Sequence, residues 1–355
     1  MNKWTKTTLP LMLYQKWTRR LKVSFIRRAA FSSNAAINLP QPLTLNEERI
    51  SNCPHSSQLE EQLQEQIAQK LLSHYAAQTP VILRSAVSHQ KAITSWSDLQ
   101  YLEDTVGFDI PCEVEIGSSY GSHEGVINST IAFGDYINYI RLFQEQQQKQ
   151  KQQFDPKQEP PKEFVYMAQH QLFPSLRKDI TLPSLSSSTK YGIGHGKLYS
   201  SLIWFGPSGC KSTLHYDPCD NLLMQFVGRK KVMLYPPQPR EKRGMGVPTP
   251  CRIHQVEMKK YEEETCQNNN EGDIDETPKD DWYYAGQGSS LGGQQYNTSA
   301  VDVENPDLIK NPLFAHAPPA RIGILNPGDV LFIPIQWWHF VRSLDTSVSV
   351  NVWWR

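Results

Sequence analysis

The sequence predicts a mainly β fold, a double-stranded β-helix of the jelly-roll or cupin kind, with flanking α/β elements on its N-terminal side. Short apolar and β-branched runs separated by Gly and Pro turns favour this fold, because such runs are typical of sandwiches and barrels. They cover residues 202–205, 222–227, 232–235, 321–325, 330–334 and 348–354. A chain of 355 residues is long enough for one domain of roughly 200 to 250 residues with extensions.

Residues 1–45 have the composition of a targeting segment. They contain eight Lys or Arg residues and no acidic residue, the first carboxylate being Glu47. A basic, Ser-bearing and acid-free segment with only short apolar runs is typical of a transit peptide rather than a secretory signal. We therefore expect a mitochondrial or other organellar location. The alternative is a basic nuclear or nucleic-acid-binding tail, with a nuclear or cytoplasmic location.

Residues 46–143 are predicted to form an α/β preamble to the core. Between Gln58 and Ala76 a leucine or isoleucine recurs every fourth residue, which predicts an amphipathic helix. These positions are Leu59, Leu63, Ile67 and Leu71. Residues 79–84 are typical of a short strand, and Ser97 or Asp98 is suited to cap a second helix.

Two polar stretches interrupt the predicted core. Residues 144–162 are rich in Gln, Lys and Pro, with too little apolar surface to offset the entropy lost on ordering, so we expect a surface loop. Residues 163–355 are predicted to be the catalytic core. Within them, about 244–297 combine Asn, acidic and Gly-rich runs, and so long a segment of this kind inside a compact domain indicates an insertion.

Composition also limits the partners of the chain. The 36 basic residues balance the 36 acidic ones, so no overall field recruits nucleic acid or an anionic membrane. No stretch approaches the roughly 20 apolar residues of a transmembrane helix. The six cysteines form no C-x-x-C pair, which predicts free thiols in a reducing compartment.

Three residues are candidate metal ligands. In an extended segment residues i and i+2 project to one face, so His215 and Asp217 would bring an imidazole and a carboxylate together. His339, which follows the turn at 326–329, is available as the third ligand. Two histidines and one carboxylate on one face leave three coordination positions open, which is the arrangement of non-haem Fe(II) oxygenases.

A run of three basic residues follows the predicted strand at 222–227. A cation directed into the core would be costly unless it met an anion, and the distal carboxylate of 2-oxoglutarate is a suitable one. Strand alternation places Lys230 on one face and Arg229 with Lys231 on the other. Periodicity alone leaves open which face is inside.

Several longer motifs resemble one known family. The segments STLHYD at 212–217, GRK at 228–230, VDVENPD at 301–307 and PGDVLFIP at 327–334, followed by Trp338-His339, are similar to the small, cupin-like JmjC proteins. The resemblance covers residues 58–355 and is strongest for the JmjC domain-containing protein five family. That family is associated with arginyl hydroxylation and with histone lysine demethylation.

The resemblance implies roles for individual residues. His215, Asp217 and His339 would hold Fe(II), and four further residues would contact the co-substrate 2-oxoglutarate: Lys230, Ser212, Asn221 and Tyr166. Glu115 and Trp204 match residues that face a guanidinium in the arginyl hydroxylases, and Gln169 would line the same pocket. The stretch 121–129 lacks the tryptophan of the family, and the insertion is outside the family pattern.

The resulting prediction is an Fe(II)- and 2-oxoglutarate-dependent protein hydroxylase that consumes dioxygen and releases succinate and carbon dioxide. An arginyl side chain in a protein or peptide is the favoured substrate. Two alternatives stay open: N-methyl-lysine demethylation, which releases formaldehyde, and a non-catalytic cupin-like binding module. The sequence does not indicate the oligomeric state.

Overall fold

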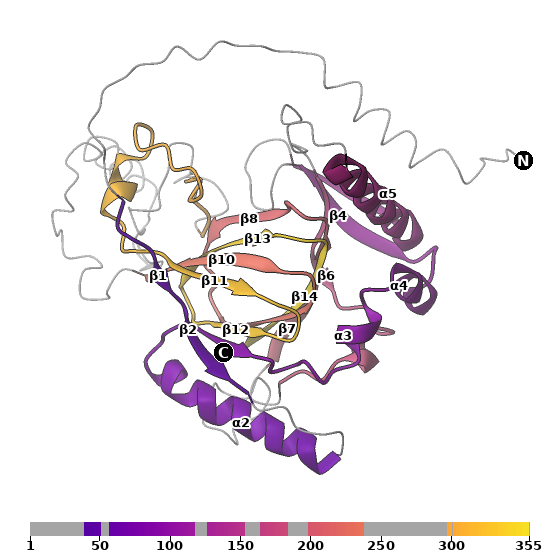
Figure 1. Cartoon of the computed structure of the whole chain (residues 1–355), viewed down its shortest axis with the longest axis horizontal. Helices are drawn as coiled ribbons and strands as arrows, with labels where there is room; N and C mark the ends of the chain where they lie inside the picture. The colour runs from indigo at the N-terminus through magenta and orange to yellow at the C-terminus, as the bar shows by residue number, and fades with distance from the viewer. Residues whose placement is uncertain are drawn as a thin grey trace, which may run out of the picture.

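Two β-sheets packed face to face form the centre of the protein. The structure, a computed structural model, describes residues 39–50, 57–117, 126–152, 164–183, 198–237, 297–299 and 301–354. The smaller sheet has the strand order β1-β11-β10-β13-β8, and the larger has the order β2-β3-β12-β9-β14-β7-β6-β4-β5. In Figure 1, α4 and α5 lie on the side of the larger sheet away from the smaller one, and α2 lies beneath β2.

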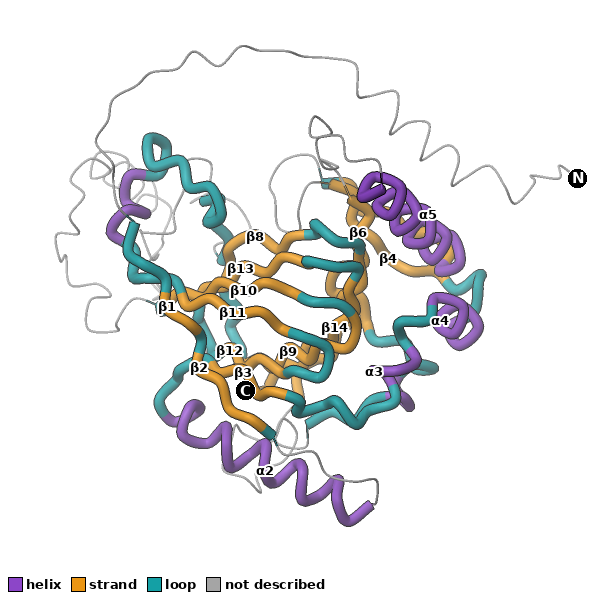
Figure 2. The backbone as a smooth tube through the Cα atoms, viewed as in Figure 1, coloured by secondary structure: helices purple, strands orange, loops and turns teal. Residues whose placement is uncertain are grey.

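The strands from β7 onwards form the double-stranded β-helix. They are β7 (Leu198–Gly206), β8 (Lys211–His215), β9 (Asp220–Val227), β10 (Lys230–Tyr235), β11 (Arg321–Leu325), β12 (Val330–Ile333), β13 (Trp338–Ser343) and β14 (Ser347–Trp354). The short connections β7–β8, β9–β10, β11–β12 and β13–β14 each join one sheet to the other. Figure 2 shows these loops along one side of the smaller sheet. The predicted fold class and its six strand-like runs are confirmed.

The part of the chain before β7 adds strands to both sheets and helices to one face. Its strands are β1 (Leu43–Thr44), β2 (Asn46–Arg49), β3 (Val81–Arg84), β4 (Pro111–Gly117), β5 (Ile127–Ala132) and β6 (Phe164–Gln171). Its helices are α2 (Ser57–Ala76), α3 (Ala92–Ser95), α4 (Leu99–Val106) and α5 (Phe133–Gln152). No helix among the described residues is long and apolar enough to cross a membrane.

The predicted helices of the preamble are confirmed. In α2, Leu63, Ile67 and Leu71 are buried, as their spacing predicts. Asp98 caps α4, since its carboxylate accepts hydrogen bonds from the backbone N–H groups of Gln100 at 2.9 Å and Tyr101 at 3.3 Å.

The predicted loop at 144–162 is wrong in its first half, because α5 continues to Gln152. Buried apolar residues such as Tyr136 and Ile140 fix the beginning of this helix, and the Gln and Lys residues that follow are good helix formers. Residues 153–162 lie outside the described residues, as does most of the predicted insertion. At the other end, β1 and the buried Leu45 belong to the fold, although the predicted leader includes them.

Three apolar layers pack against these sheets, one between them and one on each outer face. The layer between them takes side chains from both, including Leu223 and Ile333 of the larger sheet and Val232 of the smaller. The helices cover the outer face of the larger sheet, and residues 301–320 cover part of the outer face of the smaller. Every strand of the double-stranded β-helix therefore has a buried inner side.

The buried carboxylate of Asp179, in the turn after β6, forms hydrogen bonds with residues of the α3–α4 region. Asp179 accepts hydrogen bonds from Trp96 Nε1 at 3.0 Å, Tyr101 OH at 2.7 Å and Lys91 Nζ at 3.0 Å. Burial raises the pKa of this carboxyl, but the three donors outweigh burial and hold the pKa below its ordinary value. The ionised carboxylate is therefore the form that stabilises the fold.

We expect Asp179→Ala to lower the free energy of unfolding by roughly 3 kcal/mol, because it leaves the buried Trp96 N–H without an acceptor. Since the folded-state pKa is lowered, the contribution is complete above the ordinary carboxyl pKa of about 4 and is lost as the pH falls below it. Urea unfolding at pH 7 and at pH 3 measures both effects. Asp104→Ala, at an exposed position on α4, is the control. Equal losses in the two variants would contradict the assignment.

Candidate metal and 2-oxo acid site

The two histidines lie opposite each other on neighbouring strands. His215 is the last residue of β8, and His339 of β13 is its direct partner in the antiparallel ladder. Their ring centroids are 4.2 Å apart. Directly opposed residues of an antiparallel pair share a face, so both imidazoles project to the space between the sheets.

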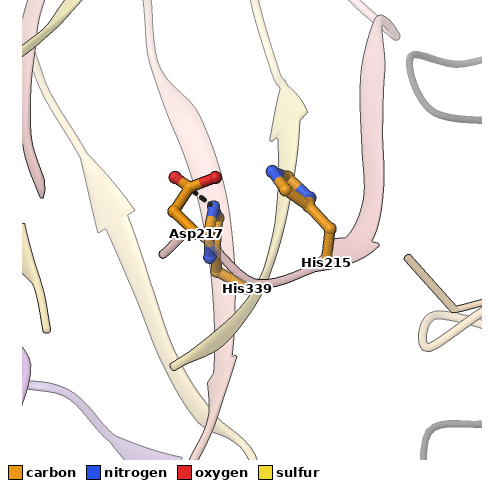
Figure 3. Close-up of side chains that lie close together, drawn as sticks. All are labelled: His215, Asp217 and His339. Carbon is orange, nitrogen blue, oxygen red and sulfur yellow. Dashed lines mark ion pairs between the residues drawn. The ribbon is translucent and has the colours of Figure 1, made fainter. Parts of the chain in front are cut away.

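Asp217 completes a group of three. The ligand atoms of His215, Asp217 and His339 all lie within 4.8 Å of one another, and His339 Nε2 is 3.7 Å from Asp217 Oδ2. Figure 3 shows the three side chains pointing toward one another. The prediction that they converge is confirmed. Asp217 itself belongs to the connection between β8 and β9, two residues beyond the end of β8.

Hydrogen bonds orient both imidazoles for metal binding. The Nδ1 atom of His215 is 2.6 Å from the carbonyl oxygen of Thr213, and Nδ1 of His339 is 3.0 Å from that of Trp337. A carbonyl oxygen only accepts, so each Nδ1 carries the proton and each Nε2 is the atom that can bind a metal. Carbonyl partners of this kind are typical of metal-binding histidines.

The carboxylate of Asp217 is oriented in the same way. Its Oδ2 atom accepts from Trp353 Nε1 at 2.9 Å and from Asn221 Nδ2 at 3.3 Å. Asn351 in turn donates to Asn221 Oδ1 at 2.7 Å. Hydrogen-bonded carboxylates are also usual at metal sites.

The charge state of His339 suits a ligand. Burial first, and then the neighbouring His215, lower the pKa of His339 to about 4. The imidazole is therefore neutral near pH 7, which is the form that coordinates a metal. Two imidazoles and one carboxylate fit a divalent iron ion in a site with open positions.

The triad lies in a pocket that also contains a buried lysine. The pocket has a volume of about 360 Å³, part of it continuous with solvent. It is lined by Tyr166, Trp204, Ser212, His215, Asp217, Asn221, Leu223, Lys230, Ile333, His339, Val341, Asn351 and Trp353. The mixture of apolar walls with a few polar groups suits a small ligand.

Lys230 is the basic residue that faces inward. It is only 2% exposed, and its Nζ donates to Ser349 Oγ at 2.6 Å. Arg229 instead pairs with Asp345 at the surface, and Lys231 pairs with Glu304 on the outer face. Burial lowers the pKa of Lys230 to about 7. A carboxylate bound beside it would favour the charged ammonium.

A register shift brings Ser212 into the same pocket. His339 pairs with His215, but Val341 pairs with Ser212, so one extra residue of β8 is accommodated between the two pairs. Ser212 and His215 are three residues apart and would face opposite sides of a regular strand. The shift places both on the pocket wall, together with Asn221 and Tyr166, as the resemblance implies.

The three residues assigned to the substrate differ in their position relative to the pocket. Trp204 lines the pocket, with its ring 5.9 Å from that of Tyr166. Glu115 is the direct cross-strand partner of Tyr166 and so shares its face of the sheet, although Glu115 is not among the residues that line the pocket. Gln169 is exposed, at a position of β6 with a φ of 51° where the register shifts, and it is not among the lining residues.

The carboxyl group of Glu115 lies in surroundings that disfavour its charged form. Burial raises its pKa to about 7, and its Oε2 atom is buried without a hydrogen-bond partner among the described residues. Such an atom usually marks a missing ligand, water or ion. A cation beside the pocket would supply what this carboxylate lacks.

Sequence reasoning missed two residues of the last strand. Asn351 and Trp353 line the pocket, and Trp353 contacts the metal-ligand carboxylate directly. Their i, i+2 spacing in β14 was a usable signal, because it places both on one face. Trp353 is therefore more than a core residue, because its indole N–H donates a hydrogen bond to Asp217.

Comparison with known proteins gives a consistent result. A profile of the cupin-like domain family matches residues 68–355. The protein named lysine-specific demethylase JMJ30 of Arabidopsis thaliana is 29% identical over 287 residues, or 80% of this chain and 52% of its own length. Lysine-specific demethylase 8 of Xenopus tropicalis is 32% identical over 286 residues, covering 79% and 49% of the two chains.

A third relative carries the domain in its name. Jumonji C domain-containing protein 5 of Drosophila melanogaster is 29% identical over 288 residues, which are 79% of this chain and 56% of that protein. The chain thus spans about half the length of the curated relatives it matches. The match over residues 68–355 shows that this chain belongs to the cupin-like domain family, with JmjC proteins as its relatives.

Proposed function

We propose that this protein is an Fe(II)- and 2-oxoglutarate-dependent oxygenase that oxidises a C–H bond in a protein side chain. One observation carries the proposal: a pocket that contains two histidines and a carboxylate within 4.8 Å of one another also contains a buried lysine. The triad supplies three ligands for iron and leaves three positions for a chelating 2-oxo acid and dioxygen. The lysine supplies the countercharge for the far carboxylate of that acid.

Iron bound at this triad would activate dioxygen, giving one oxygen atom to the 2-oxo acid as it splits into succinate and carbon dioxide, and the other to the substrate. The protein contributes the geometry. His215 and His339 are fixed by backbone carbonyls, and Asp217 is fixed by Trp353 and Asn221. These contacts hold the ligands in position before the metal binds.

Lys230 would orient the co-substrate. Its ammonium group lies in the pocket lined by the triad, where a small anion could neutralise its charge. Ser212, Tyr166 and Asn221 are further polar groups on the same wall. A dicarboxylate held at both ends would present its 2-oxo end to the metal.

Two products remain possible for the same oxidation. The names of the relatives favour N-methyl-lysine demethylation, in which the hydroxylated methyl group leaves as formaldehyde. The arginyl hydroxylation implied by the resemblance would leave the oxygen on the side chain. Glu115 suits either substrate, because arginine and methylated lysine are both cations. The third alternative is a module that binds a ligand at this site without catalysis.

A turnover assay with a peptide library separates these alternatives. With Fe(II), 2-oxoglutarate and ascorbate, we expect succinate together with either a mass gain of one oxygen atom or formaldehyde and the loss of a methyl group. Asp217→Ala should reduce the rate by more than about 100-fold, since changes outside the ligand shell already cost 10–100-fold. Asp302→Ala, at an exposed position, is the control. An iron-loaded protein that never converts 2-oxoglutarate, with or without peptide, would refute the proposal.

We expect Lys230→Met to abolish 2-oxoglutarate binding and to stabilise the ligand-free protein by roughly 1–4 kcal/mol, because it removes a buried charge. The pKa of Lys230 is about 7 in the folded state, below that of an unfolded lysine, so the penalty is complete at and below pH 7. The gain in stability should shrink as the pH rises toward 10. Thermal unfolding at pH 6.5 and pH 9.5 measures the difference. A methionine variant less stable than wild type at pH 6.5 would show that the ammonium has a structural role.

The composition of residues 1–45 also supports an organellar location, which we propose for the whole chain. A fluorescent reporter fused behind these residues should collect in mitochondria or another organelle. Replacement of Arg19, Arg20, Arg27 and Arg28 by Gln should release it. A reporter that is diffuse or nuclear with the native segment would contradict the proposal.

A further inference from the structure

The backbone that carries Asp217 belongs to neither neighbouring strand. β8 ends at His215, and β9 begins at Asp220. No strand ladder therefore supports the intervening residues, and their position depends on individual hydrogen bonds. Because a metal site requires ligands held within about 0.5 Å, the groups that fix this backbone affect metal affinity directly.

Asn297 forms a closed pair of hydrogen bonds with Tyr216, the residue between the two ligands. The backbone N–H of Tyr216 donates to the carbonyl oxygen of Asn297 at 3.0 Å. The side-chain Nδ2 of Asn297 donates to the carbonyl oxygen of Tyr216 at 2.9 Å. Both backbone polar groups of Tyr216 are thus held by a single residue.

The residues after Asn297 continue this contact along β8. Thr298 forms an isolated antiparallel bridge with His215, and the N–H of Ser299 donates to the carbonyl oxygen of Leu214 at 2.8 Å. These are backbone contacts, which survive a change of side chain. The hydrogen bond from Asn297 Nδ2 depends on the side chain, so a substitution can remove it alone.

Two further contacts join the same backbone to the segment around His339. The ring of Tyr216 packs edge-on against Trp338, with centroids 4.9 Å apart. The N–H of Gln336 donates to the carbonyl oxygen of Asp217 at 3.0 Å. A displacement of Tyr216 would therefore change the spacing of all three ligands.

We propose that Asn297 is a positioning residue of the metal site, whose side-chain amide fixes the carbonyl of Tyr216 and thereby the spacing between His215 and Asp217. The inference rests on the proposed function, because it assumes a metal at this triad. Asn297 is neither one of the three candidate ligands nor one of the residues that line the pocket. Its effect would act through the backbone alone.

The test uses the full chain and Co(II) as the probe. Affinity is measured by competition with a chelator, and the visible absorption spectrum of the bound ion reports its coordination geometry. Asn297→Ala should weaken Co(II) binding by about 10-fold or more and alter the spectrum. Asn297→Asp keeps the size of the side chain but replaces the donor with an acceptor, so it should weaken binding at least as much. Asn305→Ala, at an exposed asparagine, should bind Co(II) like wild type.

The aspartate variant decides between positioning and packing. If Asn297→Asp binds Co(II) with the affinity and spectrum of wild type, the proposal is overturned, because shape alone would then suffice. It also decides the question if the alanine variant does not fold. Wild-type protein that binds no Co(II) at all would overturn the proposed function as well, which separates the two failures.

Discussion

The pairing of β13 with β8 is the constraint on which the site depends. It places His339 directly opposite His215, with both imidazoles on the inner face and 4.2 Å between their centroids. A slip of one residue would turn His339 to the outer face of the sheet and disperse the triad. Because these strands come from distant parts of the chain, the ligands meet only when the double-stranded β-helix closes. Metal affinity and folding are therefore linked through this one register.

The space between the two sheets is an apolar core in one part and a partly polar pocket in another. Leu223 and Ile333 belong both to the apolar layer and to the pocket wall. Farther along the space the apolar side chains give way to Asn221, Lys230 and Asn351, all at most 5% exposed. Asn221 and Asn351 are hydrogen-bonded to each other, whereas the buried ammonium of Lys230 lowers stability unless an anion meets it. The fold thus gives up part of its stability at the place where a charged co-substrate would bind.

Patterns of neighbouring residues predicted the secondary-structure elements and the metal ligands. They did not predict which side chains face the interior, because that depends on contacts between distant segments. The six strand-like runs and the histidine–aspartate spacing are features of neighbouring residues, and they were found. Periodicity could not decide whether Lys230 or Arg229 faces inward, because the two sheets set that choice. The register shift that admits Ser212 is likewise a property of two paired strands. The loop predicted at 144–162 begins too early, because the polar half of the helix at 133–152 is held by its apolar half.

On the substrate side of the site, recognition of a side chain and the choice of reaction product depend on different features. Glu115 shares a face of the sheet with Tyr166 through their direct pairing. Its Oε2 atom is buried without a hydrogen-bond partner in the described part of the chain, and under the proposed function arginine or methylated lysine would supply one equally well. Charge recognition at this carboxylate would therefore select a class of side chain. The product of the proposed reaction would depend instead on which C–H bond of that side chain lay nearest to the metal.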